Sequence, residues 1–409
     1  MGTKEHQQTE HEEIEENQVA GAEWEQLPDE LLSLVLSAVD PLFVGIAART
    51  CRAWYRCAPP ALRDRLYQAA VCSSKPLLQW AVQGEAKTGL CPVNEELAAM
   101  IARQGHLELL KWAREGLNCP WDEHTCSLAA GQGHLQLLQW ARANGCAWGE
   151  WTCVEAAKNG QVEVLKWARE NGCPWDRRVC CFAAQRGQLE ALKWARTNGC
   201  PWDQRACTWA AGNGHLEVLQ WARENGCPWS GDTCCEAALA GRLEVLQWAR
   251  ENGCPWDERT CSSAAWNGHL EVLQWAHAHG CRWTASTCMN AAANGHLEML
   301  KWLTANGCPW STFICHIAAR RGQLEVLKWA RENGRPWDEE TCSMAAGNGH
   351  LEVLKWAREH GCPWDERTCT AAAENGHVEV LKWARENKCP WTTRARKYGA
   401  EHGYVEEES

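Results

Sequence analysis

The most chemically suggestive residues of this chain are cysteines and histidines that recur at fixed intervals. Cys254, Cys261 and His269 have counterparts in most copies of one repeated segment. Thiolate and imidazole together form a common ligand set for zinc. The intervals of 7 and 8 residues between them, however, are longer than the short Cys-x-x-Cys spacing of structural zinc sites.

Substitutions at these positions also argue against a metal site. Arg335 replaces the first cysteine in an otherwise regular copy, and the histidine is replaced by Gln161, Gln188, Gln323 or Arg242 in other copies. Because arginine cannot take the place of a metal ligand, we expect no bound metal and no cofactor. We expect instead that the cysteines are buried, reduced and act as small apolar side chains. The histidines are expected to bond backbone groups between helices, which glutamine can also do.

Motifs of the common enzyme classes are absent from the sequence. It contains no glycine-rich phosphate loop, no Gly-x-Ser-x-Gly elbow and no paired acids beyond those on helix surfaces. We therefore do not expect this chain to be an enzyme.

The negative charge of the chain is concentrated at its two ends. The net charge is −11, and residues 1–23 hold seven Glu and one Lys, while residues 401–409 hold four Glu and no Lys or Arg. The nearly neutral body offers neither a basic face for nucleic acid nor a polybasic patch for an anionic membrane. No apolar run is long enough to span a bilayer, and the N-terminus lacks the order of a signal peptide. We expect a cytoplasmic or nuclear protein.

A repeat of 27 residues organises most of the chain. Its 28 Trp against 3 Phe and 4 Tyr indicate that one template was copied many times. One Trp series recurs every 27 residues from Trp121 to Trp391, and a second recurs at the same interval from Trp140 to Trp383. The copy at Pro255–Cys281 reads PWDERTCSSAAWNGHLEVLQWAHAHGC.

Each copy predicts two helices. Asp257 follows the Pro-Trp pair and is a good N-cap for a first helix. Asn267 and Gly268 supply turn chemistry, after which Leu270–Ala276 has the period of a second helix with Leu270, Leu273 and Ala276 on its buried side. Gly280 can end that helix in the left-handed conformation.

The pattern from the paired alanines through Gly-His-Leu-Glu-Val-Leu-Lys-Trp-Ala-Arg-Glu-Asn-Gly resembles the helix–turn–helix of ankyrin repeats, over roughly Ala69–Gly403. Ankyrin repeats are typically about 33 residues long, and the segment that would form their β-hairpin finger is only Cys-Pro-Trp here. The resemblance implies an all-α, ankyrin-like helical solenoid without fingers. We assign it to residues 61–403: a degenerate first repeat with Trp80, about ten regular repeats and a truncated last one, before an acidic tail at 404–409.

Residues 24–60 do not fit the repeat and follow an acidic segment, 1–23, that we expect to be disordered. Their Leu-Pro-Asp-Glu-Leu-Leu start and later Cys-Arg-Ala-Trp resemble an F-box, a helical module that binds the Skp-type adaptor of cullin–RING ubiquitin ligases. Phe43, Gly45 and Arg49 depart from the usual pattern. The resemblance implies these adaptor-binding residues: Leu27, Pro28, Leu31, Leu32, Val35, Leu36, Cys51 and Trp54. Alternatively, the segment only caps the first repeat.

The positions that vary between repeats predict a binding surface. Three of them, spaced i, i+4 and i+7 along the first helix, share one helical face, and in ankyrin-like stacks the first helix lines the concave side. Large apolar side chains on such a face are typical of interaction hot spots, although drift on a solvated face is the alternative. The predicted target-binding groove holds Trp151, Arg178, Phe182, Trp209, Trp266, Asn290, Phe313, Ile317, Arg320 and Met344.

Both resemblances together imply a receptor that presents a target protein to a cullin–RING ubiquitin ligase. Chains that combine an F-box with ankyrin-like repeats resemble substrate receptors of large DNA viruses and amoebae. We expect a monomer outside its complexes. The alternatives are a ligase-independent interaction protein or host-directed effector, which would act in the host cytoplasm, and, least favoured, a thiol or metal protein.

Overall fold

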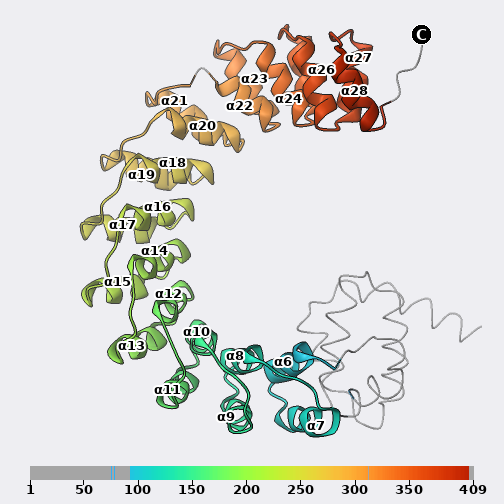
Figure 1. The fold of residues 1–409 in the computed structure, drawn as a ribbon. Coiled ribbons are helices and arrows are strands. Elements are labelled where there is room, and N and C mark those ends of the chain that lie inside the picture. Colours follow the sequence, from blue (N-terminus) through green and yellow to red (C-terminus); the bar gives the residue numbers. More distant parts are fainter. Residues whose placement is uncertain (1–74, 76–77, 79–92, 312, 405–409) are drawn as a thin grey trace, which may run out of the picture. The chain divides into compact units, whose positions relative to one another are not determined.

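The computed structural model describes residues 75, 78, 93–311 and 313–404, and Figure 1 shows these as a succession of short helices. The F-box-like segment with its eight predicted adaptor-binding residues lies outside the described residues. The same holds for residues 1–23, for the degenerate first repeat with Trp80, apart from Lys75 and Leu78, and for residues 405–409.

The chain divides into two compact units. The described part of unit 1 comprises residues 75, 78, 93–179 and 193–200, and that of unit 2 comprises 180–192, 201–311 and 313–404. Unit 1 contains α6 (Glu95–Gln104), α7 (Leu107–Leu117), α8 (Glu123–Gly131), α9 (Leu135–Ala143), α10 (Glu150–Lys158) and α11 (Val162–Glu170). Two helices are divided between the units: α12 (Arg177–Gln185) and α13 (Leu189–Thr197).

Unit 2 continues with the same alternation of first and second helices. Its helices are α14 (Gln204–Asn213), α15 (Leu216–Glu224), α16 (Gly231–Leu239), α17 (Leu243–Glu251), α18 (Glu258–Trp266), α19 (Leu270–Ala278), α20 (Ala285–Ala293), α21 (Leu297–Ala305), α22 (Ile314–Arg320), α23 (Leu324–Glu332), α24 (Glu339–Gly347), α25 (Leu351–Glu359), α26 (Glu366–Glu374), α27 (Val378–Glu386) and α28 (Thr393–Glu401). The described residues contain helices and no strand, so the predicted all-α repeat fold is confirmed. None of the described helices has the length and apolar character needed to cross a membrane.

Capping residues set the helix boundaries as the sequence predicted. The Asp257 carboxylate accepts the backbone N–H of Arg259 at 2.9 Å and so caps α18. Second helices end at a left-handed glycine, such as Gly280 with φ 86°. The Ser311 hydroxyl likewise accepts the backbone N–H of Phe313 at 3.2 Å. The regular helix α22 then begins at Ile314.

Small side chains let successive first helices pack directly on one another. In unit 2, α14, α16, α18, α20, α22, α24, α26 and α28 form such a row, and each second helix packs on its own first helix. Ala264 and Ala265 are fully buried in α18. In the second helix α19 the buried residues are Val272, Leu273 and Ala276, whereas Leu270, which we predicted to be buried, is half-buried.

The two Trp series form pairs within each repeat. Trp256 contacts Trp275 edge to face, with ring centroids 5.9 Å apart, and the guanidinium of Arg250 from the preceding repeat lies 4.6 Å over the Trp256 ring. Both rings are half-buried. The Trp pair therefore packs inside its own repeat near the surface, and the arginine that covers one ring joins it to the preceding repeat.

Candidate functional site

The recurring cysteines lie inside the repeats. Every cysteine within the described ranges is buried and carries a free thiol. Cys261 contacts Cys281, and this contact together with burial raises the pKa of the Cys261 thiol. Cys315 has Arg335 in place of a partner, and burial raises its pKa to about 11. Among the described residues no three side chains of His, Cys, Asp or Glu are grouped as metal ligands would be. The predicted burial of the cysteines is confirmed.

The recurring histidines connect each repeat to the one before it. His296 bonds through Nε2 to the carbonyl of Trp266 at 3.1 Å, and His350 bonds to the carbonyl of Arg320 at 3.0 Å. Gln323 donates from its amide to the carbonyl of Ala293 at 3.4 Å. The predicted backbone bond, and its imitation by glutamine, are thus confirmed. The acceptor is the last residue of the preceding first helix, so these bonds hold neighbouring repeats in register.

The variable positions lie on the face formed by the second, sixth and ninth residues of each first helix, which we term the first-helix face. At α22, which begins later, the equivalent residues are Phe313, Ile317 and Arg320. In unit 1, Trp151 is 42% exposed, and the Arg178 guanidinium lies 5.1 Å over its ring. Arg178 also forms ion pairs with Asp176 and Glu150, both at 2.9 Å. The hydrogen bond to Asp176 is the main cause of a raised pKa at Arg178. Trp151 and Arg178 are therefore brought together as predicted members of one surface.

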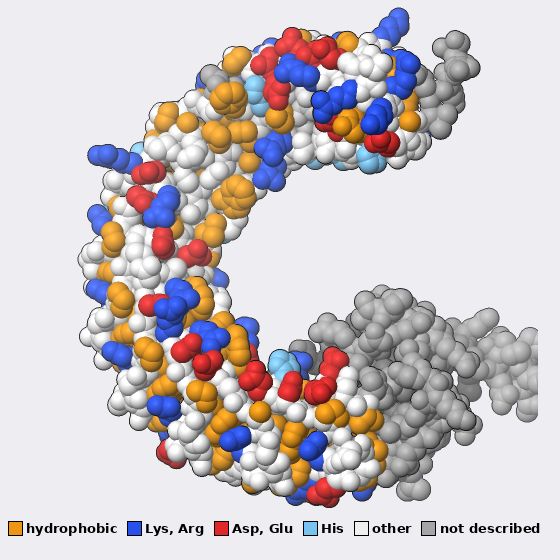
Figure 2. Space-filling model, in the orientation of Figure 1, with side chains coloured by type: hydrophobic (Ala, Val, Ile, Leu, Met, Phe, Trp, Pro, Cys, Tyr) orange, Lys and Arg blue, Asp and Glu red, His pale blue; other side chains and the backbone are white. Residues whose placement is uncertain are grey.

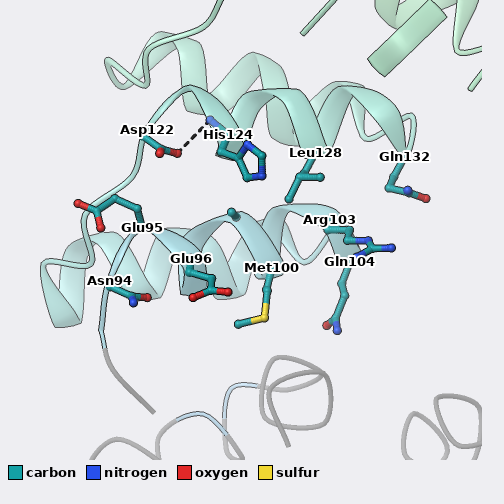
Figure 3. Close-up of a pocket in the computed structure, with 11 residues that line it drawn as sticks. Asn94, Glu95, Glu96, Met100, Arg103, Gln104, Asp122, His124, Leu128 and Gln132 are labelled. Atoms are coloured by element: carbon teal, nitrogen blue, oxygen red, sulfur yellow. Dashed lines mark hydrogen bonds between the residues drawn. The ribbon is translucent and has the colours of Figure 1, made fainter. Parts of the chain in front are cut away.

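A cleft of about 850 Å³ extends the first-helix face of unit 1 over α6 and α8. Figure 3 shows Glu96 and Met100 on α6 next to His124 and Leu128 on α8, with the Asp122 carboxylate accepting the N–H of His124 at 2.9 Å. The α6 residues were not predicted from the sequence, because Val93 stands where other repeats have the Trp that marks the repeat. The i, i+4, i+7 spacing of Glu96, Met100 and Arg103 was the signal that could have found them.

The predicted residues of unit 2 lie on the same face of its first helices. Phe182 packs against Trp209, with ring centroids 5.3 Å apart, and both are half-buried. Trp266 is 41% exposed and Phe313 is 58% exposed. Arg320 is also exposed, whereas Ile317 and Met344 are half-buried. The side-chain N–H of Asn290 donates to the Ser262 carbonyl at 3.0 Å, so part of the hydrogen-bonding capacity of this amide is already used between repeats.

One contact on this face was not foreseen from the sequence. The guanidinium of Arg321 lies 6.0 Å from the centre of the Trp266 ring, although a whole repeat, residues 282–308, separates the repeats that hold them. Figure 2 shows hydrophobic and basic side chains next to one another over this part of unit 2.

Comparisons with protein families match both modules. A model described as F-box-like matches residues 24–69. A model described as ankyrin repeats (many copies) matches residues 234–277, 288–331 and 342–385.

Among solved structures, the crystal structure of the human ASB11 ankyrin repeat domain is similar at 20% sequence identity and a TM-score of 0.33. That similarity covers 38% of this chain and 84% of the other. None of the curated proteins compared with the chain matches it.

Proposed function

We propose that this chain, an ankyrin-repeat protein with an F-box-like segment at residues 24–69, presents a target protein to a cullin–RING ubiquitin ligase. The observation that carries the proposal is the combination of the two modules. One resembles a segment that binds a Skp-type adaptor, and the other exposes aromatic and arginine side chains on the first-helix face. A protein-interaction adaptor is the function that both modules support.

In this proposal the chain supplies proximity rather than chemistry. A target held on the repeats is brought near a ubiquitin-charged enzyme that the ligase recruits, which raises its effective concentration at the reacting groups. No residue of the chain then needs a catalytic role. The proposal also places the protein in the cytoplasm or nucleus, where the adaptor and its ligase act.

The adaptor contact is assigned to the first half of the F-box-like segment. Pro28 is suited to the first turn of a helix, and Leu31, Leu32, Val35 and Leu36 would follow it on one apolar side. Cys51 and Trp54 complete the set that the F-box resemblance implies. The target contact is assigned to the first-helix face, where half-exposed aromatic residues such as Trp151 and Trp266 have the character of hot spots.

Substituting Leu31→Asp together with Leu32→Asp tests the adaptor contact. A charge placed in an apolar interface remains unpaired and costs several kcal/mol, so co-purification of the Skp-type adaptor should be lost. The matched control, Leu31→Met with Leu32→Met, keeps the volume and apolar character and should still bind. Thermal unfolding of the repeats should not change, because a solenoid derives its stability from contacts between neighbouring repeats.

The competing assignment is a ligase-independent interaction protein, or a host-directed effector, whose front segment only caps the repeats. It predicts that the unaltered chain ignores the adaptor and that the Asp variant loses thermal stability or solubility. That pair of results would refute the ligase assignment and leave the interaction role of the repeats in place.

A further inference from the structure

Arg320, on the first-helix face, and the adjacent Arg321, which follows α22, differ from the other arginines of that face in unit 2. Each of the others forms an ion pair with a carboxylate: Arg205 with Asp203, Arg259 with Asp257, Arg367 with Asp365 and Arg394 with Glu374. Neither Arg320 nor Arg321 has a carboxylate partner within the part of the chain that the structure describes. Two adjacent guanidinium groups on this exposed turn are therefore left without a counter-charge.

The residue types at this turn also depart from the repeat template. The position of Arg321 is occupied by Asn in most repeats, and Asn294 and Asn348 there donate to the carbonyl four residues earlier in their own helix. Arg321 makes no such bond in the described structure; its guanidinium lies 6.0 Å from the ring of Trp266 instead.

Between Trp266 and the arginine pair lies a helix with small side chains on its exposed face. The three first-helix-face positions of α20 are Ser286, Asn290 and Ala293. Trp266, the last residue of α18, is 41% exposed, and Phe313, which directly precedes α22, is 58% exposed. Because α20 packs between α18 and α22, the large side chains of Trp266 and Phe313 project on either side of the smaller side chains of α20.

The two sides of this surface are held in place by backbone bonds. The carbonyl of Trp266 bonds to His296, and the carbonyl of Arg320 bonds to His350. Asn290 ties α20 to α18 through the carbonyl of Ser262. A ligand would therefore meet a surface whose backbone is already ordered, which reduces the entropy lost on binding.

We propose that this surface of Trp266, Phe313, Arg320 and Arg321 recognises an acidic segment of the target protein that carries an aromatic or large aliphatic side chain. The arginine pair matches carboxylates, which guanidinium groups bind in a bidentate manner. Trp266, whose ring lies 6.0 Å from the Arg321 guanidinium, offers a surface on which the apolar side chain can pack, and the exposed Phe313 ring at the start of the same helix offers a second. The inference rests on the proposed role of the first-helix face in target binding and specifies the chemistry of the ligand.

Selection of random peptides displayed on phage against the purified full chain tests this inference. The selected peptides should be enriched in Asp and Glu next to Phe, Trp, Leu or Ile. A selected peptide should bind the Arg320→Glu, Arg321→Glu variant at least tenfold more weakly than the unaltered chain, as measured by fluorescence anisotropy. Its affinity for the unaltered chain should also fall as salt is raised. Trp266→Ala should weaken binding as well, with no change in the circular dichroism spectrum.

A matched control reverses two basic side chains away from this surface. Lys328 and Lys355 lie on the second helices α23 and α25 and pair with Glu325 and Glu352. Lys328→Glu with Lys355→Glu alters the net charge by the same amount and should leave peptide binding unchanged. Equal losses in both double variants, enrichment of basic or uncharged peptides, or no enrichment would each overturn the inference. A preference for RNA over every selected peptide would also overturn it. None of these results bears on adaptor binding, which is measured separately at residues 24–69.

Discussion

The buried thiols of α12 and α22 predict that the repeats lose stability at alkaline pH. Burial raises the pKa of Cys181 to about 12 and that of Cys315 to about 11, against a usual value of 9.0. Below pH ~9 both the folded and the unfolded chain keep these protons. Above it, the unfolded chain releases protons that the folded chain retains, so the free energy of unfolding falls as pH rises.

The magnitude follows from these two pKa values. At pH ~10 the Cys315 thiol of an unfolded chain is largely ionised, whereas the folded chain still holds it largely protonated. The free energy of unfolding is therefore lower by about 1.4 kcal/mol for Cys315. The reason is that pH ~10 lies about one unit above the pKa of the unfolded thiol and below that of the folded one, and one pH unit corresponds to that free energy. Cys181 adds a similar loss over the same interval. For a protein of ordinary stability, roughly 5–15 kcal/mol, this change is readily measured.

Urea unfolding followed by circular dichroism at pH ~7.5 and pH ~10 measures the effect. Cys315→Ala is the matched variant: a small cavity lowers its stability at both pH values, but it lacks the titrating thiol. The fall in unfolding free energy between the two pH values should be smaller in the variant by about 1.4 kcal/mol. Lysines and tyrosines titrate equally in both proteins and cancel in this difference. An identical fall in both proteins would refute the assignment of the alkaline loss to Cys315.

Two further predictions use pairs of variants that the repeats themselves provide. His296→Ala removes the bond to the Trp266 carbonyl and should lower the free energy of unfolding by about 1 kcal/mol. His296→Gln should lose much less, because Gln323 makes the equivalent bond at the same position of its own repeat. Equal losses for the two variants on thermal unfolding would contradict this prediction. Lys388 has φ 63° where the other described repeats have a left-handed glycine or, once, Asn118. Lys388→Gly should therefore raise the free energy of unfolding by about 1 kcal/mol, and Gly361→Lys, at φ 84°, should lower it by a similar amount, both measured by thermal unfolding.

The helix pairs could be predicted from the sequence because their determinants are local and repeated. A capping residue such as Asp257, a turn glycine such as Gly268 and a closing glycine such as Gly280 recur at the same register in copy after copy. The buried side of the second helix was less accurately predicted. Leu270 has the correct helical spacing, but it lies in the first turn, where the preceding repeat does not fully cover it, so it is only half-buried.

The individual contacts of the candidate surface depended on information that periodicity does not contain. The spacing placed Trp266 and Arg320 on one face, but the approach of Arg321 to Trp266 depends on the direction of a long side chain across an intervening helix. The cleft over α6 and α8 was missed for a different reason. The Trp that marks the start of a repeat is replaced by Val93, so the first helix of that repeat was not aligned with the others.

The bonds between repeats explain how the first-helix face can vary without weakening the stack. His134, His215, His296 and His350 bond to the carbonyls of Arg103, Gln185, Trp266 and Arg320, respectively. The acceptor is always a backbone group, so the bond places no demand on the side chain of the residue that provides it. The side chain at that position can therefore be a glutamine, a tryptophan or an arginine while the register of the repeats is preserved. Stability is thus assigned to the recurring alanines, histidines and glycines of the template, and the choice of partner is left to the variable side chains above them.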